Sequence, residues 1–407
     1  MDFEQILAHA NANKAELFSF LRDIVAIESF DGNEGAVIQR IRQEMEKIGF
    51  DRIEIDPMGN LLGYLGHGRH LIAMDAHIDT VTYGDKSNWT FDPFLGMENE
   101  ELIGGLGATD QKGGMASMIY AAKIIRDLQL EDDYTLLVTG TVMEENGDGL
   151  CWQYIIEQDG VRPEFALLTE PSDGCIRQGQ RGRMEIMVRT QGVSCHGSTP
   201  YLGSNAVYRM APVIAAVERL NEQMTDDGVL GKGSITISEI SSTSPSRCAV
   251  ADSCTVSLDR RLNARETPES ALAQLRALPE VVQAQATVEL YRFEQPSYTG
   301  LVYSSEKYYP SWIIQQSEPA CQSVITAFRS LFNEEPVVSP WQFSTNGVAI
   351  MGRHQIPCVG FGPGRVQYAH CPNEITYKND LVRCCAMYAS IPSLYLAHLS
   401  KDRQRAE

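Results

Sequence analysis

A chain of 407 residues exceeds the usual size of one hydrophobic core, and its 43% apolar content is enough to fill two. Its formal net charge of −19 argues against a nucleic-acid partner, because phosphate binding needs Lys and Arg clustered on one face. No apolar run reaches the roughly 18 residues of a membrane helix, and the polar, acidic start lacks the pattern of a secretory signal, so we expect a cytoplasmic protein without a membrane partner.

The first half of the chain alternates between two hydrophobic periodicities. Helical spacing predicts two amphipathic helices, over 4–27 and around 37–48. Short apolar runs at 61–65, 71–74, 134–143 and 165–168 are typical of strands, with a helix-like stretch at 115–128 between them. Strands that alternate with helices favour an α/β fold, with a mostly parallel sheet covered on both faces.

The pattern changes after Arg181. Strand-like segments at 184–188, 234–240, 254–258 and 287–291 alternate with helix-like segments at 205–220 and 269–278, an order typical of a small antiparallel sheet with helices on one face. Longer helices return from Pro319, with a strand at 358–361 and a final helix at 381–399. We therefore predict an α/β domain, residues 1–181 and 297–407, interrupted by an inserted α+β domain, residues 182–296.

The ten cysteines are scattered and include no C-x-x-C pair, which favours reduced thiols. Cys195 and Cys371 each adjoin a histidine in the sequence, which leaves a cysteine nucleophile as an alternative.

A histidine follows the predicted strand at 71–74, and strand ends of α/β sheets are where ligands bind. His77 could hold a metal through one ring nitrogen while Asp79, two positions later, accepts a hydrogen bond from the other. A pair of surface turn residues is an equally good interpretation of these two positions alone.

A glycine-rich turn at 104–114 carries Asp110 into the start of a helix. Glycines permit unusual backbone angles, and a carboxylate can bridge two cations. Phosphate binding is the rival interpretation, but the turn contains neither a Walker sequence nor a G-x-G-x-x-G fingerprint with its later acidic partner. The same lack argues against a nicotinamide-dependent oxidoreductase.

More candidate ligands follow later strands. Glu144 and Glu145 come after the strand predicted from 134, and as neighbours they point in different directions, so one can ligate metal while the other accepts a proton from water. Glu170 ends the next strand, and His370 follows the glycine turn at 360–364. Two histidines and three to four carboxylates in such loops suit a dinuclear metal site.

The order and spacing of these motifs resemble the dinuclear zinc metallopeptidase family of aminoacylase, carboxypeptidase G, acetylornithine deacetylase and succinyl-diaminopimelate desuccinylase, most closely its selenium-metabolism-linked (YgeY-type) hydrolase branch. The resemblance covers nearly the whole chain. It implies a zinc-peptidase-like catalytic domain, a ferredoxin-like lid and dimerisation domain, and a homodimer. It also implies two divalent metal ions per subunit, zinc first with cobalt or manganese as alternatives, and an amide substrate from amino acid metabolism.

The resemblance assigns roles to the candidate residues. His77 and Glu170 would hold one metal, Glu145 and His370 the other, and Asp110 would bridge them, with a cis peptide bond after it. Glu144 would be the general base and Asp79 the partner of His77. On the same ground, His196 would reach into the active site of a partner subunit and stabilise the oxyanion, Arg261 would bind a substrate carboxylate, and Gly362 and Gly364 would offer backbone contacts to the substrate.

Two segments depart from the family pattern. Ser244 precedes Pro245 where an asparagine is common, and the segment from Phe343 to Gly347 stands where many relatives have a double glycine. Both regions shape the substrate pocket, so the sequence leaves open whether the chain is a deacylase or a dipeptidase or carboxypeptidase. A catalytically silent binding or scaffold protein of the same fold is the alternative from another class; lost ligands would indicate it, and every ligand is present.

Overall fold

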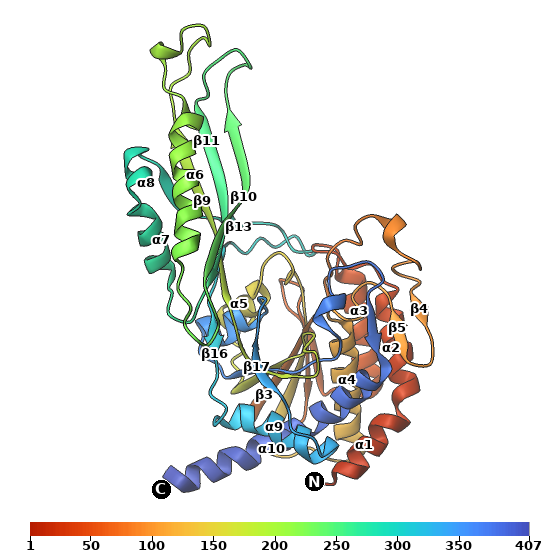
Figure 1. Ribbon diagram of the computed structural model, residues 1–407. Coiled ribbons are helices and arrows are strands. Elements are labelled where there is room, and N and C mark those ends of the chain that lie inside the picture. The colour runs from red at the N-terminus through yellow and green to blue at the C-terminus, as the bar shows by residue number, and fades with distance from the viewer. Residues whose placement is uncertain (407) are drawn as a thin grey trace.

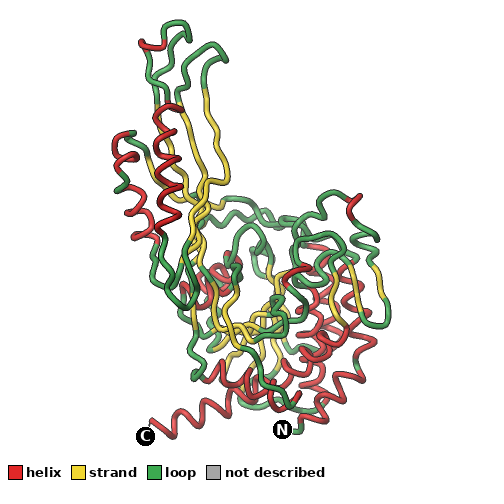
Figure 2. The backbone as a smooth tube through the Cα atoms, viewed as in Figure 1, coloured by secondary structure: helices red, strands yellow, loops and turns green. Residues whose placement is uncertain are grey.

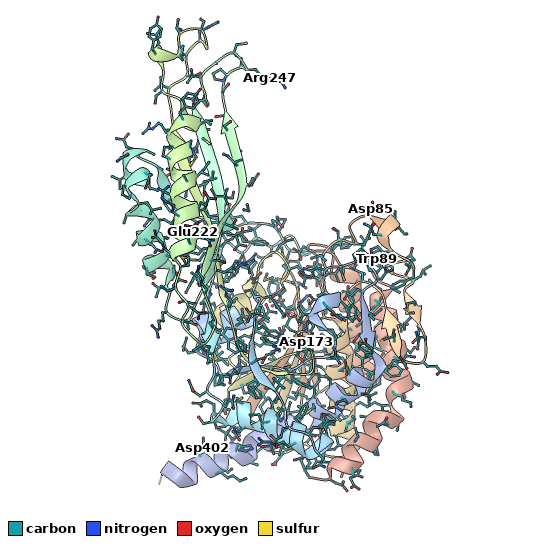
Figure 3. All side chains as sticks on the ribbon, in the orientation of Figure 1. Asp85, Trp89, Asp173, Glu222, Arg247 and Asp402 are labelled. Carbon is teal, nitrogen blue, oxygen red and sulfur yellow. The ribbon has the colours of Figure 1, made fainter. Side chains whose placement is uncertain are left out.

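The computed structural model describes residues 1–406 and consists of a large body and an elongated lid that projects from it (Figure 1). Figure 3 marks the extent of the lid, with Arg247 at its outer tip and Asp173 in the body. The body and the lid each have a hydrophobic core of their own. The fold is thus α/β with a separate antiparallel domain, as predicted; the boundaries at 181/182 and 296/297 stay predictions.

The body is built on a mixed sheet of nine strands. These are β1 (Arg52–Ile55), β2 (Leu61–Leu65), β3 (His70–His77), β6 (Tyr134–Thr141), β7 (Phe165–Leu168), β8 (Ile176–Gln180), β16 (Trp312–Ile313), β17 (Val338–Trp341) and β18 (Cys358–Gly360). The order is β1-β2-β6-β3-β7-β18-β8-β16, with β17 also beside β8. The central strands β6, β3, β7 and β18 run parallel, so their carboxyl ends meet at one edge.

Helices pack against this sheet and share its core. They are α1 (Phe3–Ala12), α2 (Lys14–Val25), α3 (Gly35–Ile48), α4 (Lys112–Asp127), α5 (Leu150–Glu157), α9 (Pro319–Phe332) and α10 (Lys378–Ala406). The expectation of one helix over 4–27 is wrong, because the chain breaks between α1 and α2 at Asn13. Asparagine competes with the helix backbone for hydrogen bonds and favours helix ends over interiors.

Two small sheets lie beside the main one. A three-stranded sheet joins β4 (Met97–Glu98), β5 (Leu102–Gly104) and β19 (Ile375–Tyr377) in the order β19-β5-β4. It connects the glycine-rich turn before α4 to the segment after His370, which lies far along the chain. The other sheet is a hairpin of β13 (Arg292–Phe293) and β14 (Ser305–Glu306).

The lid is an antiparallel sheet with helices on one face (Figure 2). Its strands are β9 (Gly182–Gln191), β10 (Ser234–Thr243), β11 (Ser253–Leu262) and β12 (Thr287–Leu290), and its helices are α6 (Ala206–Gln223), α7 (Pro268–Arg276) and α8 (Pro279–Gln283). The spatial order β10-β11-β9-β12 and the chain order β-α-β-β-α-β are those of a ferredoxin-like unit. Alternate residues of β9 are buried under the helices, so the residues between them lie on the opposite face of the lid sheet.

Both chain crossings between body and lid lie side by side. Strand β8 of the body continues into β9 of the lid after a single residue, Arg181. The returning chain forms β15 (Tyr308–Tyr309), which pairs with β9, and then β16, which pairs with β8. Before it returns, the chain passes over the body, where the Tyr298 hydroxyl donates a hydrogen bond to the carbonyl oxygen of Gly59 at 3.1 Å.

Candidate active site

The structure brings the five predicted metal ligands together at the carboxyl edge of the parallel strands. His77 ends β3, and Glu145 and Glu170 follow β6 and β7. Asp110 lies just before α4, and His370 lies in the loop before β19. These five side chains line one cleft of about 410 Å³, together with Glu144.

Asp110 lies between the two histidines. One carboxylate oxygen, Oδ1, is 3.1 Å from Nε2 of His77, and the other, Oδ2, is 3.3 Å from Nε2 of His370. The peptide bond between Asp110 and Gln111 is cis, as the resemblance implied. A carboxylate whose two oxygens face two different imidazole nitrogens has the arrangement that a bridging ligand needs.

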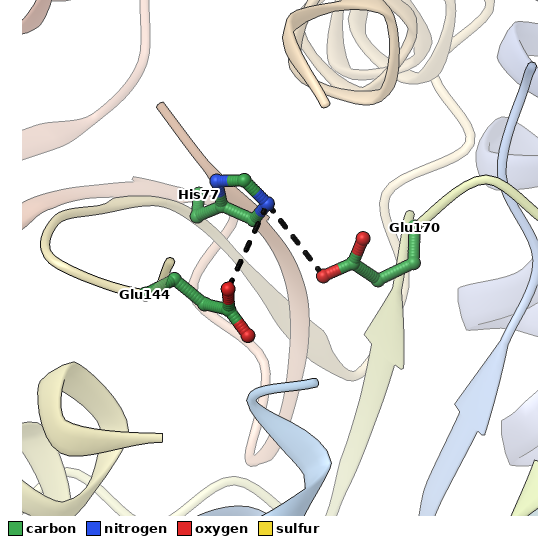
Figure 4. Close-up of side chains that lie close together, drawn as sticks. All are labelled: His77, Glu144 and Glu170. Atoms are coloured by element: carbon green, nitrogen blue, oxygen red, sulfur yellow. Dashed lines mark ion pairs between the residues drawn. The ribbon is translucent and has the colours of Figure 1, made fainter. Parts of the chain in front are cut away.

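The remaining carboxylates divide between the same two nitrogens. Glu170 Oε1 lies 3.7 Å and Glu144 Oε2 4.0 Å from His77 Nε2 (Figure 4). Glu145 Oε2 lies 2.9 Å from His370 Nε2. Glu170 therefore groups with His77 and Glu145 with His370.

Asp79 presents two oxygens to the ring nitrogen Nδ1 of His77, and its backbone oxygen is the nearer of the two. The Nδ1–H of His77 donates to the backbone carbonyl oxygen of Asp79 at 3.0 Å, whereas the nearer carboxylate oxygen is 3.6 Å away. The other carboxylate oxygen, Oδ2, accepts a hydrogen bond from the backbone N–H of Glu145 at 2.9 Å. Asp79 thus sets the tautomer of His77 through its main chain and holds the loop of Glu145 through its side chain.

Burial and crowding shift the acid–base equilibria of the site. Burial raises the pKa of Glu144 and of Glu170 well above the usual range, and neighbouring acids add to the effect. Hydrogen bonds to Asp110 and Glu145 raise the pKa of His370 to about 11. Burial alone would lower the pKa of His77, but its contacts with Asp110 and Asp79 raise it. Carboxylates and imidazoles crowded in this way compete for protons that a cation could replace.

The donor set fits divalent metal ions. Because Nδ1 of His77 donates to a carbonyl oxygen, Nε2 is the nitrogen free to offer a lone pair, and it faces Asp110 and Glu170. Two groups of three, His77 with Glu144 and Glu170, and His77 with Asp110 and Glu145, place their ligand atoms within 4.8 Å of one another. Imidazole and carboxylate are the ligands that zinc and its neighbours take in such sites.

Two residues of the site have left-handed backbone conformations. The φ angles are 61° at Met143, which precedes Glu144, and 56° at His370. Non-glycine residues rarely adopt this region, and such positions concentrate at functional sites. The sequence carries no signal for either of them.

The predicted substrate contacts have different outcomes. Arg261 lines the cleft, as do Phe343 and Ser344 of the segment that departs from the family pattern. Gly362 packs against the chain that follows β7, where an added Cβ would lie 2.0 Å from the carbonyl oxygen of Thr169. Gly364 packs likewise against Thr109. Both glycines let the chain approach the loops of Glu170 and Asp110 closely, and neither is among the lining residues.

His196 does not line the cleft that contains the metal ligands. It is exposed on the lid, and its Nδ1 contacts the hydroxyl of Ser198 at 2.8 Å. Cys371 is a poor nucleophile, because burial raises the pKa of its thiol. All ten cysteines are free thiols, as expected.

Three residues of the site escaped the sequence analysis. Glu374 is buried and accepts backbone hydrogen bonds from the loop of Asp110. Arg183 and Asp148 line the cleft and form an ion pair of 3.1 Å. Glu374 lies four residues after His370, and Asp148 lies three residues after Glu145.

This strand-end cluster of imidazoles and carboxylates defines a candidate metallohydrolase centre. The chain belongs to peptidase family M20/M25/M40, whose model matches residues 73–393. Members of this family are metal-dependent enzymes that hydrolyse amide bonds. Among the described residues, no helix is long and apolar enough to cross a membrane.

Three similar proteins illustrate the range of the family. Uncharacterized protein YgeY of Escherichia coli K12 is 58% identical over 395 residues, covering 97% of this chain and 98% of that protein. Succinyl-diaminopimelate desuccinylase of Magnetococcus marinus is 26% identical over 336 residues, covering 79% of this chain and 83% of that enzyme. Aminopeptidase PepT of Bacillus cereus has the same fold, with a TM-score of 0.71, 17% identity and coverage of 94% and 99%.

Proposed function

We propose that this protein hydrolyses an amide bond in a small peptide or an N-acyl amino acid, using two divalent metal ions, zinc in the first place. His77 and Glu170 would hold one ion, Glu145 and His370 the other, and Asp110 would bridge them. The observation that carries the proposal is the position of Asp110, whose two oxygens face the two histidines at 3.1 and 3.3 Å. When bound, two such ions lower the pKa of a shared water and polarise the substrate carbonyl.

Glu144 is the proposed general base. Its Oε1 is buried without a hydrogen-bond partner among the described residues, and its Oε2 faces the same nitrogen of His77 as Glu170 does. A base in this position takes the proton of the attacking water and returns it to the leaving nitrogen. Burial raises the pKa of Glu144 in the metal-free chain, and the positive charge of two bound metal ions would lower it again, so that the carboxylate can accept the proton.

The cleft suits a small substrate with a free carboxylate. Its volume of about 410 Å³ accommodates a dipeptide or an acylated amino acid, and Arg261 on its wall offers a guanidinium. The relatives support both reaction types, since one is named as a desuccinylase and another as an aminopeptidase. Phe343 and Ser344 at the wall would contribute to the choice between them.

A homodimer is part of the proposal. His196 is exposed on the lid and does not line the cleft of its own subunit, so it can act as an oxyanion donor only in the site of a partner. Tyr201 and Leu202 nearby have 80% and 68% of their surface exposed, which suits a protein interface. Dimers that combine Glu144→Ala subunits with His196→Ala subunits contain one intact site, so random mixing should restore about a quarter of the activity. No recovery in proven mixed dimers would contradict the shared site.

The central test combines metal analysis with catalysis. Purified protein loaded with zinc is assayed against dipeptides and N-acyl amino acids, beside Glu144→Ala. We expect about two metal ions per chain in both proteins and turnover only with Glu144 present. A protein that binds two metals and hydrolyses none of the panel would support the silent binding alternative instead.

A further inference from the structure

Two arginines of the lid lie directly opposite each other on neighbouring strands. The antiparallel register of β9 and β11 pairs Arg183 with Arg261, and Glu185 with Asp259 two residues further on. Residues two apart on a strand share a face, so these four side chains lie on one face of the lid sheet. Both arginines line the cleft that contains the metal ligands.

This pair of arginines is unfavourable unless negatively charged groups lie between or beside the two guanidinium groups. Like charges at directly opposed positions of an antiparallel sheet repel each other. Asp259 accepts hydrogen bonds from Nε and Nη2 of Arg261, at 3.2 and 3.0 Å, through a single oxygen. Arg183 is balanced by Asp148 of the body and by Glu185, which lies 3.5 Å from it and also pairs with Lys307. The lid wall is therefore close to neutral, with two guanidinium groups held in place.

Arg183 is fixed more firmly than an arginine that serves only as a surface charge. Its guanidinium carbon lies 4.7 Å from the ring centre of Tyr309, and Nη2 donates to Asp148 at 3.1 Å. Its side chain is 20% exposed, and its Nε is buried without a hydrogen-bond partner among the described residues. An arginine has five N–H donors, so a guanidinium held in this way keeps donors for a ligand in the cleft.

The two walls of the cleft carry different kinds of side chain. The body wall carries Asp110, Glu144, Glu145 and Glu170, whereas the lid wall carries Arg183 and Arg261. With metal ions bound, the charge of these acids would be compensated, and the two guanidinium groups offer an anionic group of a ligand directed N–H donors on the opposite wall. A substrate with a carboxylate at one end is thus oriented with that end toward the lid and its amide toward the body.

We propose that Arg183 acts with Arg261 as a two-guanidinium receptor for the substrate carboxylate, and that Asp148 and Tyr309 hold Arg183 in position. This inference rests on the proposed function and adds a specificity-determining residue to it. Two guanidinium groups give a carboxylate more directed hydrogen bonds than one, so the enzyme should discriminate strongly against neutral analogues.

Binding without turnover tests the receptor. Zinc-loaded Glu144→Ala protein is titrated calorimetrically with N-acetyl-DL-alanine and with its carboxamide, which lacks the negative charge. We expect the carboxylate to bind at least about tenfold more tightly than the carboxamide. Adding Arg183→Gln should weaken binding of the carboxylate about tenfold or more and leave binding of the carboxamide unchanged. Arg183→Lys, which keeps the charge but lacks the planar fork, should fall between.

Arg189→Gln is the matched control, because Arg189 lies six residues further along β9, on the same face, is exposed, and is not among the residues that line the cleft. It should change neither affinity. If Arg183→Gln weakens the binding of both ligands equally, Arg183 serves only to connect the lid to the body. That result would overturn the proposed receptor. The receptor would also be overturned if neither probe binds, although the protein with Glu144 intact hydrolyses other amides. If zinc-loaded protein hydrolyses no amide at all, the proposed function fails instead.

Discussion

Glu374 accepts a hydrogen bond from the backbone N–H of Asp110 at 2.9 Å. The same carboxylate accepts two more from the backbone N–H groups of Gly107 and Thr109, each at 2.8 Å. Glu374 follows His370 by four residues, so it fastens the loop of one candidate ligand to the loop of another. The distance between Asp110 and His370 therefore depends on Glu374, which contacts the main chain of Asp110 and the side chain of neither ligand.

Replacing Glu374 should loosen the metal site. In Glu374→Gln the amide group would turn an N–H toward donors of the loop, and we expect metal affinity or activity to fall about 10- to 100-fold. Competition between the protein and a zinc chelator measures this affinity. Glu335→Gln, at a side chain that is 78% exposed, is the control. Unchanged zinc affinity in Glu374→Gln would show that the loop keeps its position without the carboxylate.

Replacing Glu144 should separate catalysis from metal binding. Glu144→Gln keeps the size of the side chain but cannot accept a proton, so kcat should fall about 10²- to 10⁴-fold while the zinc content stays the same. Steady-state kinetics and elemental analysis of the same preparation give both values. A variant that loses zinc along with activity would assign Glu144 to ligation.

Removing the metals should make stability more sensitive to pH. In the metal-free protein the pKa values of Glu144, Glu170 and His370 are raised, so the folded state binds more protons than the unfolded state. Stability is then lost as pH rises above about 4.5 for the acids, and from about 6.5 toward 11 for the histidine. Bound metal displaces these protons. The Tm difference between zinc-loaded and chelator-treated protein should therefore be larger at pH 9 than at pH 6.

Lys112 also contributes to the pH dependence of stability in that experiment. Burial lowers its pKa to about 7, so its own contribution has the opposite sign and improves as pH rises from about 7 to 10.5. The difference between the two Tm values contains only the part of this contribution that metal binding changes. A difference that shrinks with rising pH would contradict the expected proton release.

A methyl group at Gly59 should displace the chain that returns from the lid. Gly59 has φ of 107°, and an added Cβ would lie 2.2 Å from Cε1 of Tyr298. Gly160 has φ of 71° and open space around the same position. Gly160→Ala should therefore cost about 1 to 2 kcal/mol for backbone strain alone, and Gly59→Ala clearly more, measured by chemical unfolding. Combining Gly59→Ala with Tyr298→Ala should remove the steric part, so the two changes should cost less together than their sum.

Local pattern and strand topology account for what could be predicted. The carboxyl ends of β6, β3 and β7 must meet at one edge once the sheet is parallel, and this brings His77, Glu145 and Glu170 together without knowledge of any side-chain contact. The inserted domain was recognisable because strand alternation replaces helical spacing after Arg181.

Contacts between distant segments could not be predicted in the same way. Glu374 bonds to groups 264 to 267 residues away, and the register that sets Arg183 opposite Arg261 is fixed by pairing across the lid. Asp79 shows the same limit on a smaller scale, since its backbone oxygen and its carboxylate both lie near the same ring nitrogen of His77, at 3.0 and 3.6 Å. Sequence spacing cannot rank two acceptors that belong to one residue.

The paired crossings between body and lid determine how the lid can move. Because β16 pairs with β8 and β15 with β9, the connection is a hydrogen-bonded ribbon, and a ribbon resists sideways shear while it tolerates bending and twisting. Arg183 lies on this ribbon, opposite Tyr309. Any rotation of the lid therefore swings Arg183 through a short arc close to the pivot, whereas Arg247 at the far tip sweeps a wide one (Figure 3). Arg183 of the cleft wall thereby stays close to the pivot of the movement. The surfaces at the far end of the lid, which would meet a second subunit, travel furthest.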